Sequence, residues 1–274
     1  MKNMIIPVRA SSLADLMDCP ARFEARHILG KTMPSQPNSH LGTAIHRATA
    51  VFDSSYILGE GVTADEAAGA LVDSLRDPNT EVDWSESDTT IDKAEEIGIG
   101  LHKKYCEIIT PHENYTDVEV LCEALDVNFD DLGITLRLTG STDRVRGFKD
   151  ADGAISFGIS DLKTGKMAVK TDGTVDTSKH LAQLGVYELL TEQATGKPIT
   201  KPARIVGLQT NSKLRVATAD VTSAKDVLLG TQEESGILDN AAKILKHGIF
   251  WGNPRSMMCH QRYCVAFNTC KWRK

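Results

Sequence analysis

The sequence lacks any apolar run that approaches the roughly 20 residues needed to cross a bilayer. Its first residues, MKNMIIPVRASS, also lack the apolar stretch of a signal peptide. Internal repeats and low-complexity linkers are missing as well. We therefore expect a cytosolic protein, and a chain of 274 residues that is 41% hydrophobic and 25% charged is long enough to bury a substantial core.

An excess of positive charge is also missing, because 31 Lys and Arg face 37 Asp and Glu, which gives a formal net charge of −6. Non-specific affinity for nucleic acid comes from Lys and Arg that neutralise phosphates, so this total argues against binding through the whole surface. A local basic groove stays compatible with it. An active site that holds a divalent metal must itself be acidic, which also fits a negative total.

Helical signals dominate residues 1–115. Ser12-Leu13-Ala14-Asp15 has the form of a capping box and predicts a helix that runs to about Leu29. Further helices are expected after Gly42, after the capping box Thr63-Ala64-Asp65-Glu66, and over residues 90–109.

The hydrophobic period then changes from helical to alternating. Strands are predicted at Val118–Phe129, Ile134–Leu138, Thr142–Phe148 and Ile155–Lys163, with turns at Asp130-Asp131-Leu132-Gly133 and Asp152-Gly153. A helix at Ser178–Thr195, a strand at Arg204–Thr210 and a long helix within Ser223–His247 follow.

This order of elements predicts an α/β fold with a central mixed β-sheet flanked by helices. We expect a single domain over residues 1–274. Within it, residues 1–115 form a mainly helical N-terminal part, residues 116–220 the sheet core, and residues 221–274 a C-terminal helix with a cysteine-rich tail.

Two carboxylates and a lysine fall on neighbouring predicted strands. Asp161 and Lys163 are two residues apart, so the period of a strand points both side chains to one face, and Asp143 lies on the strand before. Converging carboxylates suit Mg²⁺ or Mn²⁺, and a nearby lysine can orient or deprotonate an attacking water. The set indicates hydrolysis of a phosphodiester, although Asp-x-Lys alone is also common on ordinary surface strands.

Three side chains on predicted helices extend this set. His46 follows Gly42 at helical spacing, and neutral imidazole is a further ligand for an ion such as Mn²⁺. Gln183 and Tyr187 are four residues apart and share one helix face, from which they could hydrogen-bond DNA phosphate or the lysine. The ordinary alternatives are a half-buried histidine and a plain amphipathic helix.

The motifs Gly-x-x-x-His, Gly-x-x-Asp, Asp-x-Lys-Thr-Gly and Gln-x-x-x-Tyr occur here in that order and at a spacing that resembles the RecB-like nucleases of the PD-(D/E)XK superfamily. The resemblance spans nearly the whole chain and implies a restriction-endonuclease-like core. It implies that His46, Asp143 and Asp161 bind Mg²⁺ or Mn²⁺ and that Lys163 is the catalytic lysine. Gln183 and Tyr187 complete the expected catalytic set.

Two acidic positions qualify the resemblance. Asp161 stands where the family more often has Glu, and its shorter side chain still reaches a metal. Glu123 lies where the family often has an acidic residue that faces the site; the alternative is a solvated strand residue.

Cysteines are grouped near the C-terminus as Cys259, Cys264 and Cys270. Thiolates favour zinc or an iron–sulfur cluster, either of which needs a fourth ligand, for which Cys19 in Asp18-Cys19-Pro20 is suitable. The arrangement resembles the iron–sulfur nucleases of the same family, including CRISPR-adaptation nucleases and AddB-type helicase–nucleases. This resemblance implies a 4Fe-4S cluster, with zinc as the alternative.

The spacing of the trio has two extra residues in its first gap relative to those nucleases, so His260 is an alternative third ligand to Cys259. Cys106 and Cys122 are expected to be core residues instead. A cluster that joins residues about 240 positions apart would close a very long loop, and long loops gain most from a cross-link.

We therefore expect a metal-dependent deoxyribonuclease, in particular an exonuclease, in a bacterial, archaeal or phage-infected cell. Recombination, repair, phage replication and CRISPR adaptation are compatible contexts. The motif Gly-x-x-x-x-Gly-Lys-Ser/Thr is missing, so any unwinding must come from a helicase or recombination partner. The competing interpretations are a non-catalytic DNA-binding module and a zinc-stapled RNA-processing protein.

The tail combines basic and aromatic side chains, which suits single-stranded DNA or DNA ends through phosphate contacts and stacking. A merely solvated terminus is the alternative. The residues concerned are Arg255, Arg262, Tyr263, Phe267, Lys271, Trp272, Arg273 and Lys274.

Overall fold

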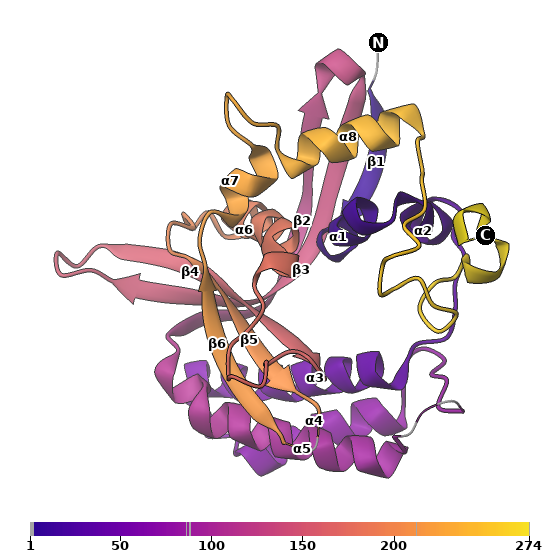
Figure 1. Ribbon diagram of the computed structural model, residues 1–274. Helices are drawn as coiled ribbons and strands as arrows, with labels where there is room; N and C mark the ends of the chain where they lie inside the picture. The colour runs from indigo at the N-terminus through magenta and orange to yellow at the C-terminus, as the bar shows by residue number, and fades with distance from the viewer. Residues whose placement is uncertain (1–2, 86, 88, 212, 274) are drawn as a thin grey trace.

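A mixed β-sheet crosses the centre of the molecule in a computed structural model that describes residues 3–85, 87, 89–211 and 213–273; Lys274 of the basic tail lies outside these ranges (Figure 1). Within the described residues the sheet has six strands. They are β1 (Met4–Arg9), β2 (Tyr115–Phe129), β3 (Ile134–Lys149), β4 (Ile155–Gly165), β5 (Ala203–Gln209) and β6 (Arg215–Val221). The α/β fold with a central mixed sheet is therefore confirmed.

The long strand β3 organises this sheet. On one side it pairs antiparallel with β2 along most of its length. On the other side β1 pairs in parallel with residues 134–139, and β4 pairs antiparallel with residues 144–149. Among the described strands, none pairs with residues 140–143 on that second side, so the sheet opens at this point. Beyond β4 the sheet continues through parallel β5 and antiparallel β6.

Helices cover both faces of the sheet (Figure 1). They are α1 (Ala10–Asp18), α2 (Pro20–Phe23), α3 (Pro37–Leu58), α4 (Ala64–Arg76), α5 (Ile91–Ile108), α6 (Leu181–Thr195), α7 (Ala224–Leu229) and α8 (Ile237–His247). One buried cluster contains residues of α3, α4 and α5 with Leu162 and Val206 of the sheet. A second contains residues of α1, α6, α7 and α8 with Ile159 and Ile205. Strand residues thus alternate between two cores, as a period of two requires.

The N-terminal segment differs from the expectation in three ways. Strand β1 was not anticipated, because it is defined by pairing with Ile134–Thr139, far away in the sequence. Helix α1 starts at Ala10 without a side-chain cap, and the Ser12 hydroxyl donates to the Arg9 carbonyl, so the expected capping box is wrong. The predicted helix to Leu29 is also interrupted at Cys19 and Pro20, because proline has no N–H to continue the ladder and clashes with the preceding turn.

The other helical expectations fare better. The capping box between Thr63 and Glu66 is present at α4, and the Thr90 side chain caps α5. Helix α3 begins at Pro37, before Gly42, because proline fits the first turn of a helix. The helix expected within residues 223–247 is two helices, since the chain turns back at Gly230 and Gly236.

The strand expectations also need two corrections. The two segments predicted at 134–138 and 142–148 form one continuous strand, β3. Strand β6 was missed, and it pairs with β5 along its whole length. Both turns expected between the strands are found, with Gly133 at φ 61° and Gly153 at φ 83°.

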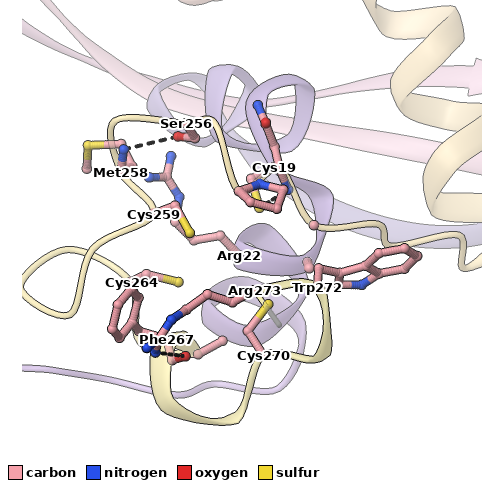
Figure 2. A pocket seen from close by; sticks show the side chains of 15 residues that line it. Cys19, Arg22, Ser256, Met258, Cys259, Cys264, Phe267, Cys270, Trp272 and Arg273 are labelled. Carbon is pink, nitrogen blue, oxygen red and sulfur yellow. Dashed lines mark hydrogen bonds between the residues drawn. The ribbon is translucent and has the colours of Figure 1, made fainter.

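After α8 the chain returns to the N-terminal helices. The Ala21 backbone N–H donates to the Trp251 carbonyl at 3.0 Å, and the Asn253 amide donates to the Asp18 carbonyl at 3.1 Å. Figure 2 shows the result, with Cys19 and the three tail cysteines around one space. No helix in the described part of the chain is long and apolar enough to span a membrane.

Candidate active site and cysteine cavity

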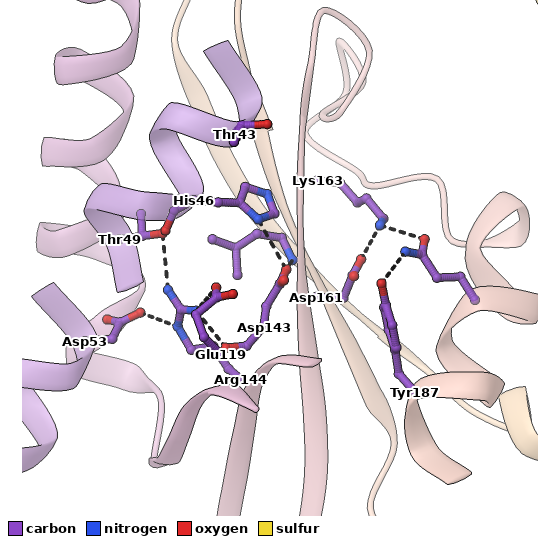
Figure 3. A network of polar contacts seen from close by, with 12 residues as sticks. Thr43, His46, Thr49, Asp53, Glu119, Asp143, Arg144, Asp161, Lys163 and Tyr187 are labelled. Carbon is purple, nitrogen blue, oxygen red and sulfur yellow. Dashed lines mark hydrogen bonds and ion pairs between the residues drawn. The ribbon is translucent and has the colours of Figure 1, made fainter. Parts of the chain in front are cut away.

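The carboxylates of Asp143 and Asp161 meet where the sheet opens between β3 and β4 (Figure 3). Asp143 Oδ2 accepts a hydrogen bond of 2.7 Å from the Leu162 backbone N–H, which fixes its position at the start of the gap. Asp161 is buried, and its Oδ2 lies 2.6 Å from Lys163 Nζ. This contact is an ion pair. Its angles do not meet those of a hydrogen bond, and no other described residue donates a hydrogen bond to this oxygen.

His46 reaches this pair of carboxylates from α3. Its Nδ1 lies 3.6 Å from Asp143 Oδ2. Burial alone lowers the pKa of His46, but the Asp143 carboxylate outweighs burial and leaves this pKa raised. Burial raises the pKa of Asp143, but the imidazole and the Leu162 N–H outweigh it and leave this pKa lowered. Burial raises the pKa of Asp161, and the neighbouring charge of Asp143 adds to the rise while Lys163 opposes it.

Helix α6 supplies the hydrogen bonds that hold the lysine. Lys163 Nζ donates to Gln183 Oε1 at 2.8 Å, and Gln183 Nε2 donates to the Tyr187 hydroxyl at 2.9 Å. The spacing of four residues places both side chains on the helix face that meets β4. Asp161, Lys163, Gln183 and Tyr187 therefore form one polar chain across the helix–sheet interface.

Two glycines allow the helices to approach the sheet at the site. A Cβ at Gly42 would collide with the Thr164 hydroxyl on β4, so only glycine lets α3 lie this close. A Cβ at Gly140 would come within 2.8 Å of the Tyr187 ring. The glycines of the two sequence motifs are thus explained by close packing.

Arg144 was not anticipated from the sequence. Its side chain is fully buried, and its Nε donates to Asp53 Oδ2 at 2.7 Å while its Nη1 donates to the Asp143 carbonyl at 2.7 Å. Asp53 lies on α3, two turns after His46, and also accepts from the Tyr105 hydroxyl at 2.6 Å. Arg144 therefore ties the helix of His46 to the strand of Asp143. In the sequence, the only signal for this link is the spacing of seven residues between His46 and Asp53, which places both on one face of a helix.

The acidic residue of β2 that faces this network is Glu119, not Glu123. Its φ of 50° lies in the left-handed region, and its Oε1 accepts from Arg144 Nη1 at 3.2 Å. Figure 3 shows the Glu119 carboxylate on the same side as Asp143. Burial raises the pKa of Glu119, and the charge of Asp143 adds to the rise. Glu123 is exposed four residues further along the strand.

The cysteines Cys19, Cys259, Cys264 and Cys270 line a single cavity between α2 and the tail (Figure 2). The Asn253 backbone N–H donates to Cys19 Sγ at 3.4 Å, which orients that sulfur. Burial raises the pKa of Cys264, and the nearby thiols of Cys19 and Cys259 add to the rise. His260 is not among the described residues that line the cavity; its Nδ1 accepts from the Arg262 backbone N–H.

Cys106 and Cys122 are buried away from this cavity, in the two cores. Over the described residues, no three His, Cys, Asp or Glu side chains are already grouped as metal ligands. Both donor sets nevertheless have the chemistry of a cation site. One pairs the buried Asp161 carboxylate and the partly buried Asp143 carboxylate with an imidazole, and the other places four thiols around one space.

Comparison with known proteins identifies the family of this fold. The sequence model of the PD-(D/E)XK nuclease superfamily matches residues 8–273. The chain therefore belongs to the PD-(D/E)XK nuclease superfamily, whose members hydrolyse phosphodiester bonds and usually use Mg²⁺ or Mn²⁺.

A solved structure with the same fold comes from Eubacterium rectale and is named as an exonuclease candidate. It is 13% identical to this chain, with a TM-score of 0.52, and the match covers 92% of this chain and 86% of the other. The search of curated proteins finds no match.

Proposed function

We propose that the protein is a RecB-like deoxyribonuclease that holds Mg²⁺ or Mn²⁺ with His46, Asp143 and Asp161. The observation that carries this proposal is the convergence of the buried Asp161 carboxylate, the Asp143 carboxylate and the His46 imidazole, where the Lys163 ammonium, 2.6 Å from Asp161 Oδ2, balances one of the two negative charges. Buried carboxylates are costly unless they are paired or bind a metal. A divalent cation at this position would offset that cost, as it does in hard oxygen sites.

The bound cation would polarise the scissile phosphate and an attacking water. The ammonium of Lys163 is held by Gln183 Oε1 at 2.8 Å. It can therefore orient the attacking water or stabilise the negative charge that develops on the oxygens of the scissile phosphate. Tyr187 anchors Gln183 through its hydroxyl and thereby fixes the lysine. Glu119, next to Asp143, adds a third acidic group to the site.

We infer that the substrate is DNA and that cleavage starts from ends. The name of the Eubacterium rectale structure supports an exonuclease, and the basic and aromatic tail supports contact with single strands. Recombination, repair, phage replication or CRISPR adaptation, with a helicase or recombination partner for unwinding, are the processes we propose for such an enzyme.

The decisive test is digestion of end-labelled single- and double-stranded DNA with Mg²⁺ or Mn²⁺. Asp161→Ala and Lys163→Ala should lose cleavage while they keep the fold, whereas Asp150→Ala at the exposed β3–β4 turn should cleave normally. DNA binding in Ca²⁺ should survive better in Lys163→Ala than in Asp161→Ala, because only the latter loses a metal ligand. Cleavage at the wild-type rate by either site variant would contradict the assigned roles. Inactive wild-type protein that binds DNA would favour the non-catalytic module.

We further propose that Cys19, Cys259, Cys264 and Cys270 hold a 4Fe-4S cluster. Their position around one cavity supports this ligand set over one that uses His260. Anaerobically purified protein should contain about four iron atoms per chain and show the brown absorbance of such a cluster. Zinc at one equivalent without iron would contradict the cluster and favour the zinc-stapled alternative, whose substrate would be RNA.

A further inference from the structure

Arg22 is a buried arginine inside the wall of the cysteine cavity. It lies on α2, three residues after Cys19, and is 4% exposed. Figure 2 shows its side chain among the cysteines that surround the cavity. Its Nη2 lies 2.5 Å from Asp15 Oδ1 and 3.7 Å from Asp18 Oδ2. Its Nε and Nη1 have no hydrogen-bond partner among the described residues.

This arrangement leaves two donors of a charged group unpaired in a buried place. An unsatisfied donor on a charged group is among the more costly defects in a protein interior. The carboxylates near Arg22 are on the side of Nη2, and Asp18 is already bound by the Ser256 hydroxyl at 2.5 Å. The remaining acceptors that line the same cavity include four cysteine sulfurs, which accept weakly as thiols and strongly as thiolates.

We propose that Arg22 is the charge partner of the metal–sulfur centre in this cavity and that its Nε–H and Nη1–H donate to sulfur atoms of the bound cluster or its cysteines. The inference rests on the cluster proposed above. Four thiolates and a 4Fe-4S core carry net negative charge, and reduction by one electron from an external reductant adds to it. A buried cation with two N–H donors therefore stabilises the reduced state most and raises the reduction potential.

Arg26 provides a matched control. It lies one helical turn later, is 55% exposed on its side chain, and approaches the same Asp15 at 4.0 Å, but it does not line the cavity. A second control is Asp15→Asn, which removes the partner of Nη2 and leaves Nε and Nη1 unchanged. It should lower thermal stability without lowering the potential, because it removes a negative charge and keeps the cation.

The experiment is a titration of the intact, anaerobically purified protein with dithionite, followed by electron paramagnetic resonance, together with iron release to a chelator. Arg22→Gln should show a lower reduction potential and roughly tenfold faster iron release than the wild type. Arg22→Lys keeps the charge and loses the paired donors. Its reduction potential and its rate of iron release should therefore lie between those of the wild type and of Arg22→Gln. Arg26→Gln should match the wild type in both measurements.

The outcomes separate this inference from the cluster itself. Wild-type protein without iron contradicts the cluster and, with it, the role of Arg22. Iron-loaded Arg22→Gln and Arg22→Lys with the potential and release rate of the wild type contradict the role of Arg22 and leave the cluster standing. If Arg22→Gln does not keep its cluster or its fold, Arg22→Lys decides by the same two measurements.

Discussion

Glu188 is a buried carboxyl that the proposed chemistry does not use. It lies on α6 against the start of α7, and burial raises its pKa to about 7, with Lys225 lowering it and Glu192 raising it. Asp161 is also buried with a raised pKa, but it faces a set of groups suited to a cation. Burial of a carboxyl therefore marks a functional group only where suitable neighbours converge on it.

Replacement of Glu188 by Gln should stabilise the protein at alkaline pH. The folded state holds the proton more tightly than the unfolded state, so wild-type stability falls as pH rises from the unfolded value of about 4.3 through 7. Above about pH 8, Glu188→Gln should be more stable by on the order of 2 kcal/mol, with no gain near pH 4. Urea unfolding across this range measures the difference. Glu192→Gln, which breaks an ion pair with Lys225, should not stabilise; a gain there would contradict the assignment.

At the scale of elements, the site depends on how α3 is fixed to the sheet. Arg144 on β3 binds Asp53 on α3, and Gly42 lets the same helix contact β4. One contact is a buried ion pair, and the other is close steric packing. Both act on the helix that carries His46, so both set its distance from Asp143.

The first of these contacts can be tested with Asp53→Ala. This change removes the fully buried carboxylate that pairs with Arg144 and leaves the half-exposed Glu119 as its carboxylate partner, which should destabilise folding by roughly 3–5 kcal/mol. Asp126→Ala removes the partner of Arg137 in an exposed pair and should change stability little. Chemical denaturation of both variants makes the comparison. Equal losses would show that Arg144 is not held as described.

The second contact can be tested with Gly42→Ala. The added methyl group meets the Thr164 hydroxyl and pushes α3 away from β4, which should reduce cleavage roughly tenfold to a hundredfold through misplacement of His46. The double variant Gly42→Ala/Thr164→Ala removes the clash and should recover activity. Initial rates on end-labelled DNA decide, and a double variant as slow as the single one would argue against this packing role.

At the scale of the whole molecule, two cores share one sheet. The core under α3–α5 and the core under α1, α6, α7 and α8 lie on opposite faces of this sheet. Strands β4 and β5 contribute buried residues to both cores. This continuity supports our proposal that residues 1–274 form a single domain. The tail is fixed differently, through Asn253, Ser256 and the proposed cluster.

Cys19→Ser should therefore lower the melting temperature of the iron-loaded protein. The cluster would close a loop of about 240 residues, and the loss of such a link should lower the melting temperature by on the order of 10 °C. The same variant should lose iron. After chemical removal of the cluster, wild type and Cys19→Ser should melt together. A difference that persists without iron would mean that Cys19 stabilises the chain by packing alone.

The sequence by itself determined the elements whose signals are local. The capping box at Thr63 and the turns at Gly133 and Gly153 predicted α4 and the hairpins correctly, because their hydrogen bonds and backbone angles involve residues close in the chain. The ordered motifs also placed Asp143, Asp161 and Lys163 on neighbouring strands, since the alternation of a strand is likewise local.

Only the tertiary structure decided the rest. Strand β1 exists through pairing with Ile134–Thr139, and Arg144 meets Asp53 across 91 residues of sequence. Glu119 took the place expected for Glu123 because its neighbours Val118 and Val120 pair with Arg144 and Thr142, which sets Glu119 opposite Asp143, and this pairing is not encoded in the periodicity. The unpaired donors of Arg22 follow from the return of the tail to α2. Each depends on free energy gained between distant segments, which local spacing cannot report.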